Sequence, residues 1–542
     1  MMHASLRLIC AMLLVSAWNA VVAQETRPNV IVILADDVGY SDIGCFGSEI
    51  ATPALDALAA DGLRFTQFYN TARCCPTRAS LLTGLYPHQA GVGYMTDMAP
   101  YSSRAMINGW YAGDLRSDAV TLGEVMRTAG YATYAVGKWH VTKNINEDSS
   151  RDNWPLQRGF DRFYGILPGA SNYFEPPHLS RDNTRIRYDA DPEYPVKDFY
   201  LTDAFSDHAV RYLREHAERS PEKPFFMYLA YTAAHWPLQA KPSDIAKYRG
   251  RYDSGYTPIR KARFEKMRRM GILGEDDGLS PQVGDWGSVE RKDWEARRME
   301  VYAAQIDAMD QGIGRVVAEL KRSGRFENTL ILFLQDNGAC AENVVRNPGG
   351  RQFKKGDLLP MPGPAETWLS YGEAWANVSS TPFRLYKHYV HEGGIATPLV
   401  AHWPRGIRRR GELETQPGHL IDIMATLVDV AKASYPRSRA GLPVQPMEGR
   451  SLVPAFSGTK IERDALFWEH EGNRALRIGD WKLVAKGTST PWELYRMDRD
   501  RSELHDLAQA EPERVKEMAA IWDRWARRTH AVPWPWKPPY AE

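Results

Sequence analysis

The stretch VIVILADD, Val30 to Asp37, indicates the class of fold. Five apolar residues are followed at once by a short turn that carries two aspartates. An apolar run without polar alternation is typical of a strand buried on both faces, as in the parallel sheets of α/β proteins. Polar residues directly after such a strand lie at the carboxyl edge of the sheet, where these folds bind ligands. The stretch therefore predicts a buried strand that ends in a binding site.

Three further apolar runs have the same design, because each leads into polar residues capable of chemistry. Their ranges are 131–136 before Lys138 and His140, 225–230 before His235, and 330–334 before Asp336 and Asn337. Helical segments are expected between the strands, at 55–60, 122–128, 203–218 and 300–321. This alternation predicts a large, mostly parallel α/β sheet sandwiched by helices, with one pocket shared by the strand ends.

A second decisive stretch is NTARCCPTRASLLTG, Asn70 to Gly84. Pro76 suits the first turn of a helix and Gly84 suits its end. Cys74 is then expected just ahead of the helix, where backbone N–H groups favour an anionic substrate and a lowered thiol pKa. The alternative interpretation is an ordinary turn before a helix, with two buried thiols.

Two pairs of residues at strand ends offer only oxygen ligands: Asp36 with Asp37, and Asp336 with Asn337. Oxygen donors without thiolate or imidazole favour Ca²⁺, with Mg²⁺ as the alternative, over zinc or copper. The alternative for each pair taken alone is that it caps the next helix. Both pairs at one edge of one sheet predict a metal site.

Charge and length narrow the class of protein. The 542 residues include 68 basic and 67 acidic side chains, a formal net charge of +1, so we expect no nucleic-acid partner. Residues 1–23 contain Arg7, an apolar run and small residues before a cleavage point after Ala23, which is typical of a signal peptide. The run is short for a membrane span. The chain is therefore expected to be exported, periplasmic or secreted, without a membrane anchor.

Four cysteines remain after the signal peptide: Cys45, Cys74, Cys75 and Cys340. They are too few for a disulfide scaffold in a chain of this length. A bridge between Cys45 and Cys340 stays open as an alternative, but sequence cannot supply the geometry that a disulfide needs. We expect two unpaired thiols at these positions.

The sequence divides into two expected parts after the signal peptide. Residues 24–435 form the predicted catalytic domain, in which the charged segment 241–300 is expected to be exposed and 338–380 to be a long loop near the site. Residues 440–542 contain short apolar segments typical of antiparallel strands and then a helix over 513–527 with one apolar face. They predict a small C-terminal α+β subdomain.

The spacing of Cys74, Pro76 and Arg78 resembles the signature of type I sulfatases, in the alkaline phosphatase-like superfamily, and long stretches look like bacterial arylsulfatases. Cys75 does not fit, because Thr77 stands where the signature needs proline. The resemblance implies that a formylglycine-generating enzyme converts Cys74 to formylglycine (3-oxoalanine). It also implies metal ligation by Asp36, Asp37, Cys74, Asp336 and Asn337, and catalytic roles for Cys74, Arg78, Lys138, His140, His235 and Lys387.

The resemblance further implies how these residues act. The hydrate of formylglycine attacks sulfur with one hydroxyl and expels sulfate with the other. Arg78 and His140 would stabilise and orient the hydrate, and Lys138 and Lys387 would neutralise the sulfuryl oxygens. His235 would protonate the leaving oxygen. One departure is Ile395–Ala396–Thr397 before Pro398, where the family usually has arginine; it puts a local salt bridge or substrate contact in doubt.

The predicted activity is hydrolysis of sulfate monoesters, with aryl sulfates accepted and sulfated polysaccharides or oligosaccharides as alternative natural substrates. A phosphonate or phosphate ester hydrolase is a rival, but such relatives tend to have histidine where this chain has Asn337. A non-catalytic, calcium-dependent binding protein is the other rival, and it requires that Cys74 is never converted.

Overall fold

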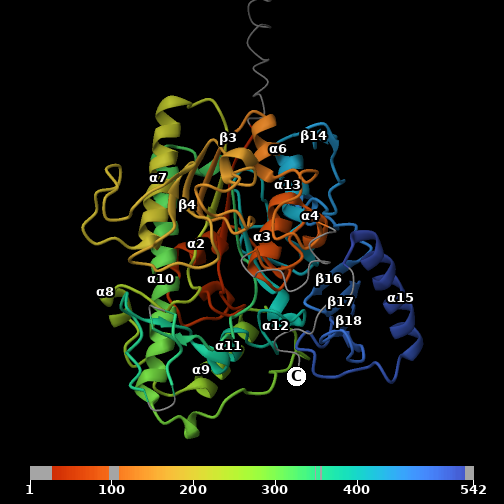
Figure 1. Cartoon of the computed structure of the whole chain (residues 1–542). Coiled ribbons are helices and arrows are strands. Elements are labelled where there is room, and N and C mark those ends of the chain that lie inside the picture. Colours follow the sequence, from red (N-terminus) through yellow and green to blue (C-terminus); the bar gives the residue numbers. More distant parts are fainter. Residues whose placement is uncertain (1–26, 97–108, 348–349, 355–356, 532–542) are drawn as a thin grey trace, which may run out of the picture.

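The computed structural model describes residues 27–96, 109–347, 350–354 and 357–531 (Figure 1). The predicted signal peptide lies outside these ranges. Within them, an eleven-stranded sheet crosses the molecule in the order β12-β2-β11-β8-β1-β7-β3-β4-β5-β6, with β13 also paired to β2. A separate four-stranded sheet has the order β16-β17-β18-β19.

The strands of the large sheet are β1 (Asn29–Ala35), β2 (Leu63–Tyr69), β3 (Ala132–Lys138), β4 (Arg162–Ile166), β5 (Leu179–Arg181), β6 (Thr184–Arg185), β7 (Phe225–Ala230), β8 (Thr329–Gln335), β11 (Ala396–His402), β12 (Glu412–Glu414) and β13 (Gly418–His419). Smaller sheets contain β9 (Val345–Arg346), β10 (Trp368–Leu369), β14 (Ser438–Arg439), β15 (Leu442–Pro443), β16 (Leu466–His470), β17 (Asn473–Ile478), β18 (Trp481–Ala485) and β19 (Glu493–Arg496). The helices are α2 (Pro53–Ala60), α3 (Cys74–Thr83), α4 (Pro87–Ala90), α6 (Leu122–Thr128), α7 (Leu201–Arg219), α8 (Pro242–Ala246), α9 (Tyr256–Arg269), α10 (Lys292–Arg322), α11 (Gly372–Ser379), α12 (Glu392–Ile395), α13 (Asp422–Val430), α14 (Val453–Phe456) and α15 (Pro512–Thr529).

The four strands predicted from apolar runs form the contiguous centre of the sheet, β8-β1-β7-β3. They are parallel and closely in register, with Ile31 opposite both Met227 and Ile331. β11 is antiparallel to both of its neighbours, β2 and β8, and β5 is antiparallel to β4. The prediction of a mostly parallel sheet is thereby confirmed. Adjacent parallel strands bring their polar endings to the same edge.

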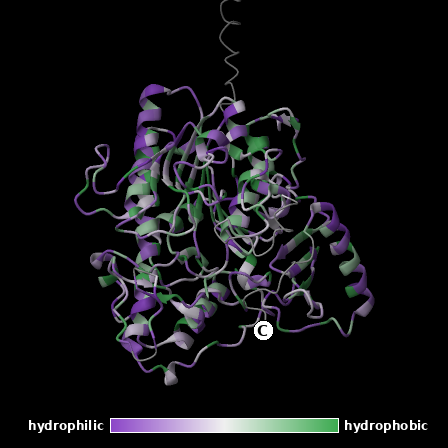
Figure 2. Ribbon diagram, viewed as in Figure 1, coloured by the Kyte–Doolittle hydropathy of each residue, from purple (hydrophilic) through white to green (hydrophobic). Residues whose placement is uncertain are grey.

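Helices cover both faces of the sheet, as the fully apolar β1 requires. Ile31 and Ile33 lie in a core with residues of α2, α7 and α10, whereas Val30 and Val32 lie in a second core with residues of α3, α6 and α13. Figure 1 shows α7 and α10 on one side and α3, α6 and α13 on the other. Apolar residues are concentrated along the central strands, and hydrophilic residues lie on the outer helices (Figure 2). The four predicted helices are present, as parts of α2, α6, α7 and α10.

The charged segment 241–300 is less exposed than we predicted. It contributes α8, α9 and the start of α10, and Arg260 and Arg263 of α9 are buried. Arg263 contacts Asp42 at 2.5 Å and Glu49 at 2.8 Å. Many other residues of the segment are exposed, as we predicted, but the prediction was wrong for Arg263. The carboxylates that neutralise its charge come from a distant part of the sequence, which periodicity within the segment cannot reveal.

The second sheet and α15 form the C-terminal part of the described chain, in blue beside α3 in Figure 1. Met518, Trp522 and Trp525 of α15 are buried, so its predicted apolar face is its packing face. The boundary predicted between residues 435 and 440 stays a prediction. Across the described ranges, the helices lack the combination of length and apolar character that crossing a membrane requires.

Candidate active site

The stretch around Cys74 forms α3, with Arg73 as its N-cap and Gly84 as its C-cap. Gly84 is in the left-handed region (φ 69°), the conformation that favours glycine at a helix end. The helix begins at Cys74 itself, earlier than we predicted, since we expected Cys74 just ahead of the helix. Pro76 lies in its first turn, as predicted. Cys74 is buried, with 1% of its surface exposed.

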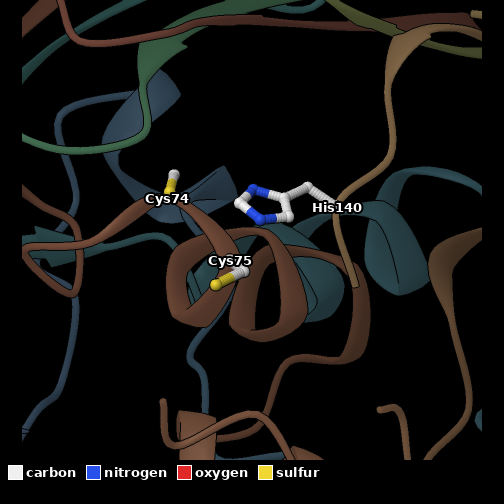
Figure 3. Close-up of side chains that lie close together, drawn as sticks. All are labelled: Cys74, Cys75 and His140. Atoms are coloured by element: carbon white, nitrogen blue, oxygen red, sulfur yellow. The ribbon is translucent and has the colours of Figure 1, made fainter. Parts of the chain in front are cut away.

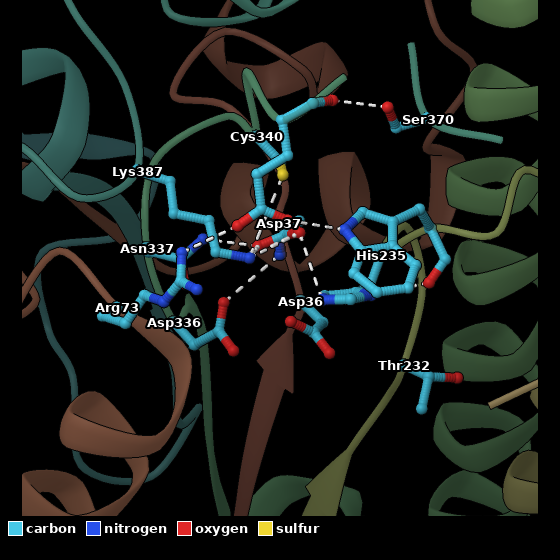
Figure 4. A network of polar contacts seen from close by, with 12 residues as sticks. Asp36, Asp37, Arg73, Thr232, His235, Asp336, Asn337, Cys340, Ser370 and Lys387 are labelled. Carbon is cyan, nitrogen blue, oxygen red and sulfur yellow. Dashed lines mark hydrogen bonds and ion pairs between the residues drawn. The ribbon is translucent and has the colours of Figure 1, made fainter. Parts of the chain in front are cut away.

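The oxygen-bearing pairs after β1 and β8 meet at the carboxyl edge of the sheet. The backbone N–H of Asp37 donates to Asp336 Oδ1 at 3.2 Å, and Asn337 Nδ2 donates to Asp37 Oδ1 at 2.7 Å. Asp36, Asp336 and Asn337 have no exposed surface, and Asp37 is 1% exposed. The two pairs therefore lie together at one edge of the sheet, as we predicted (Figure 4).

Two cationic side chains approach this cluster from β3 and α3. Lys138 Nζ lies 2.7 Å from Asp36 Oδ2. Arg78 Nη2 lies 2.8 Å from Asp336 Oδ2 and 3.5 Å from Asp36 Oδ2, and its Nη1 donates to the Lys138 carbonyl at 3.0 Å. The guanidinium of Arg78 thus bridges Asp36 and Asp336, which follow β1 and β8, to the backbone of β3.

Lys387 and His235 approach Asp37 from opposite directions (Figure 4). Lys387 Nζ lies 2.8 Å from Asp37 Oδ1, and His235 Nε2 lies 3.5 Å from Asp37 Oδ2. Burial alone would raise the pKa of Asp37, but these two groups outweigh burial and lower it. Burial lowers the pKa of His235 to about 4, so the ring is neutral near pH 7.

The residues of this cluster fit a divalent cation. Asp36 Oδ1 and Asn337 Oδ1 are buried and accept no hydrogen bond from any described residue. Burial, followed by the negative charge of nearby Asp336, raises the pKa of Asp36. The positive side chains around these closely spaced carboxylates therefore do not fully balance their negative charge. Oxygen donors in this arrangement suit Ca²⁺ or Mg²⁺.

Cys74 and Cys75 lie in the first turn of α3, and the His140 side chain, from the segment after β3, lies beside them (Figure 3). The ligand atoms of the three side chains lie within 4.8 Å of one another. A hydrogen bond from Cys75 lowers the pKa of the Cys74 thiol well below its usual range, and the charges of Lys138 and Lys387 act in the same direction against burial. Position 74 is therefore a site that stabilises negative charge, as an anionic substrate requires.

The structure brings together every site residue predicted from the sequence and adds others that were missed. Glu342 accepts hydrogen bonds from Trp236 Nε1 at 2.8 Å and Arg73 Nη1 at 2.9 Å. Lys387 and Arg73 hold the pKa of Glu342 well below its usual range despite burial. Glu342 lies in the irregular segment after β8, where no periodicity marks a position. The only available signal was the proximity of Arg73 and Trp236 to predicted site residues in the sequence.

Cys340 is also close to the site, since Lys387 Nζ lies 3.9 Å from its Sγ. Cys45, Cys74, Cys75 and Cys340 are all buried, and the structure has none of these four in a disulfide. The alternative of a Cys45–Cys340 bridge does not hold in this structure. Burial raises the pKa of both Cys45 and Cys340, which keeps these thiols protonated and unreactive.

Known proteins resemble this chain along almost its whole length. Residues 28–433 match the family described as Sulfatase, and residues 383–527 match the family described as N-sulphoglucosamine sulphohydrolase, C-terminal. An uncharacterized sulfatase of Schizosaccharomyces pombe is 33% identical over 92% of this chain and 93% of its own length. An arylsulfatase of Klebsiella aerogenes is 35% identical over 82% of this chain and 95% of its own. The solved structure of Ps i-CgsB in complex with k-i-k-neocarrahexaose is 25% identical, has a TM-score of 0.66, and covers 94% of this chain and 95% of its own.

Proposed function

The chain belongs to the sulfatase family and is a sulfuric ester hydrolase, and from this premise we propose that formylglycine at position 74 and a bound Ca²⁺ carry the reaction. One observation carries the proposal. Cys74 at the start of α3, four oxygen-bearing side chains and two lysines all meet at the carboxyl edge of β8-β1-β7-β3. Mg²⁺ is the alternative cation.

Asp36, Asp37, Asp336 and Asn337, with position 74, would hold the cation, which would supply Lewis-acid chemistry at the sulfuryl oxygens. Formylglycine at position 74 would supply, as its hydrate, one hydroxyl for attack on sulfur and one for release of sulfate. The remaining chemistry falls to this chain's own side chains, whose positions support the following roles.

Arg78 and His140 act on position 74. Arg78 is fully buried and fixed by Asp336 and by the Lys138 carbonyl, so its guanidinium is preorganised to stabilise a hydroxyl there. The His140 ring lies beside Cys74 and accepts a proton from the attacking hydroxyl (Figure 3).

Lys138 and Lys387 receive the sulfuryl group. Both ammonium groups contact metal-site carboxylates, Asp36 at 2.7 Å and Asp37 at 2.8 Å. When the charge of those carboxylates is taken up by the cation, the two ammonium groups become available to the negative oxygens of a sulfate ester. Their burial strengthens this interaction, because water does not screen it.

His235 donates to the leaving oxygen. Its Nδ1 lies 2.6 Å from the Trp236 carbonyl, an acceptor, so Nδ1 carries a hydrogen and Nε2 faces the site. A neutral ring with its hydrogen on Nδ1 has no proton on Nε2, so His235 can donate from Nε2 only after that nitrogen is protonated. The negative charge of a bound sulfate ester would favour the protonated ring.

Aryl sulfates are the proposed test substrates, and carbohydrate sulfates are the alternative natural substrates. Ps i-CgsB, with which this chain shares fold and 25% identity, was solved with a neocarrahexaose. Around the site of this chain, half-buried Trp236 and Trp368 lie with ring centroids 6.1 Å apart, and Glu342 with Arg73 adds polar groups. An aromatic face beside a carboxylate and a guanidinium suits a hydroxylated ring as well as a phenol.

The other proposed properties follow from the family and from residues outside the described ranges. Maturation requires a formylglycine-generating enzyme as a transient partner. The signal peptide at residues 1–23 would direct the chain out of the cytoplasm. The substrate is a small-molecule or saccharide sulfate ester; we propose neither a nucleic-acid partner nor a membrane anchor.

The experiment compares Cys74→Ala with Cys75→Ala, a matched control one residue along the same helix. Each protein is produced with a formylglycine-generating enzyme, supplied with Ca²⁺ and assayed on an aryl sulfate. We expect Cys74→Ala to lose turnover to background and Cys75→Ala to retain it, with formylglycine detected by peptide mass spectrometry in the wild type and in Cys75→Ala. Equal loss in both variants, or turnover by unconverted protein, would refute the assignment of Cys74.

A further inference from the structure

Glu342 is an acidic side chain at the site that takes no part in the proposed chemistry. It lies in the segment between β8 and β9. Its side chain is 26% exposed, whereas the metal-site residues Asp36 and Asp336 have no exposed surface. Because the sulfuryl end of a substrate would bind at the buried side chains, the leaving group would extend toward the exposed side. Glu342 therefore lies where the protein would meet the leaving group.

Two hydrogen bonds attach Glu342 to residues beside the two proposed reacting groups. Arg73, which immediately precedes Cys74, donates from Nη1 to Glu342 Oε1 at 2.9 Å. Trp236, which immediately follows His235, donates from Nε1 to Glu342 Oε2 at 2.8 Å. The rings of His235 and Trp236 lie with their centroids 4.7 Å apart. Glu342 therefore connects the surroundings of the proposed nucleophile to those of the proposed proton donor.

The Glu342 carboxylate can accept one more hydrogen bond. Its Oε1 accepts from Arg73 and lies 3.1 Å from His388 Nε2. Among the residues that the structure describes, Trp236 is the one donor to Oε2. A carboxylate oxygen can accept two hydrogen bonds, so Oε2 has one position to offer. A hydroxyl group of a bound substrate is a donor that suits this position.

The charge of Glu342 disfavours a second anionic group on the substrate. Lys387 and Arg73 hold the pKa of Glu342 well below its usual range despite burial, so the carboxylate is ionised. Arg73 is less accessible, because its side chain is 10% exposed, its Nη1 binds Glu342, and its Nε lies 3.1 Å from Met95 Sδ. Lys387 is 1% exposed. An anionic group of the leaving group would therefore meet the carboxylate before either cation.

We propose that Glu342 selects the leaving group, because its carboxylate accepts a hydrogen bond from a hydroxyl group near the sulfate ester and repels a second anionic group at the same place. The half-buried Trp236 ring provides the adjoining surface. This inference rests on the proposed hydrolysis of sulfate esters. It names the class of substrate that the site favours, which is a monosulfate ester whose leaving group is hydroxylated and otherwise uncharged.

The test compares phenyl sulfates that carry hydrogen, a hydroxyl or a carboxylate at ring position 2 or 3. Each ester is assayed with Ca²⁺-loaded wild type, in which formylglycine has been verified, and with Glu342→Gln, which preserves side-chain size and removes the charge. The readout is the kcat/KM of each substituted ester divided by that of phenyl sulfate. Comparing this ratio between the variant and the wild type cancels the intrinsic reactivity of the esters.

The two ratios should move in opposite directions. We expect Glu342→Gln to lower the hydroxyl-to-hydrogen ratio about tenfold or more at the favoured ring position, because a hydrogen bond to an ionised group is lost. The carboxylate-to-hydrogen ratio should rise about tenfold or more, because the like charge is removed. Glu342→Asp keeps the charge but withdraws the carboxylate, so it should lose the hydroxyl preference and keep the exclusion. Glu462→Gln, whose parent side chain is 81% exposed, is the matched control and should change neither ratio.

A purely structural role for Glu342 would lower the turnover of all the esters by the same factor. Unchanged ratios in Glu342→Gln, or a wild type that prefers the carboxylate esters to phenyl sulfate, would each overturn this inference while the proposed function stands. Circular dichroism checks folding, and if Glu342→Gln does not fold, a wild-type hydroxyl ratio in Glu342→Asp would overturn the inference. A verified wild type that hydrolyses none of the phenyl sulfates would instead contradict the proposed function itself.

Discussion

Replacing Lys482 with methionine should strongly destabilise the contact between the two sheets. Lys482 lies on β18, and its Nζ is 2.8 Å from Glu392 Oε1 and 2.8 Å from Glu503 Oε1. All three side chains are fully buried. Glu392 begins α12, five residues after Lys387, for which we propose a catalytic role, so this network connects the C-terminal sheet to the candidate active site.

The magnitude follows from what remains after the substitution. Methionine fills a similar volume but carries no charge, so two buried carboxylates lose their shared cation. Arg501 stays 3.4 Å from Glu392, while the one cation left within ion-pair distance of Glu503, among the residues that the structure describes, is Arg384 at 4.0 Å. Removing one partner of a buried ion pair costs about 3–5 kcal/mol. We therefore expect Lys482→Met to lower the free energy of unfolding by about that amount, chiefly through Glu503.

The assay is urea denaturation followed by tryptophan fluorescence. Lys460→Met is the matched control, because the Lys460 side chain is 75% exposed in its pair with Glu462, and it should change stability by less than about 0.5 kcal/mol. The double variant Lys482→Met/Glu503→Gln should recover part of the loss, since it removes the uncompensated charge. A Lys482→Met protein within 1 kcal/mol of the wild type, or a double variant less stable than the single one, would refute the reasoning.

Four other outcomes are expected. Arg78→Lys should lower kcat about 10²-fold or more, because a lysine ammonium cannot make the contacts that the guanidinium makes with both Asp36 and Asp336. A change below tenfold would contradict the proposed role of Arg78. Removal of divalent cations by a chelator should abolish aryl sulfate turnover and Ca²⁺ should restore it, whereas chelator-insensitive turnover would exclude the metal role. Gly137→Ala should lower the free energy of unfolding by about 3 kcal/mol, because a Cβ at this position, where φ is 109°, would lie 1.8 Å from the Ala230 carbonyl oxygen. Thermal or urea unfolding measures this change, and wild-type stability would contradict the close approach of β3 to β7. Burial lowers the pKa of His208 to about 4 and of His419 to about 3, so below pH 6.5 these two histidines take up protons in the unfolded chain before they do so in the folded chain. Stability should therefore fall by at most about 1.4 kcal/mol per pH unit for each histidine between pH 6 and 4, and His208→Gln should reduce that slope measurably; an unchanged slope would contradict the burial argument.

The predictable part of the site lies on regular strands. Asp36, His235 and Asp336 each follow an apolar run, and adjacent parallel strands bring such residues together without further information. The helix stop at Gly84 was predictable for a similar local reason. Lys387 was different, because no strand precedes it, and only its resemblance to a family motif identified it.

The unpredictable part depends on contacts between distant segments. Glu342 and His388 lie in irregular segments on either side of α11, and only the folded chain brings them together at 3.1 Å. The burial of Arg263 depends on Asp42 and Glu49, more than two hundred residues earlier. Likewise, Lys482 is an unremarkable residue in a short apolar segment until Glu392 and Glu503 are placed around it. Local sequence patterns are enough to predict helices and strands. Whether a charged side chain is buried depends on which residues the fold places around it, and the local pattern does not show this.

The measurement that tests the central claim most directly is the ratio of kcat/KM for an aryl sulfate to that for the matching aryl phosphate and phosphonate monoesters. It uses Ca²⁺-loaded enzyme in which formylglycine at position 74 has been verified by mass spectrometry. The account predicts that sulfate ester hydrolysis dominates, since Asn337 completes an all-oxygen site, and that it disappears in Cys74→Ala. Phosphonate or phosphate turnover exceeding sulfate turnover, or untouched sulfate esters despite conversion of Cys74, would contradict it.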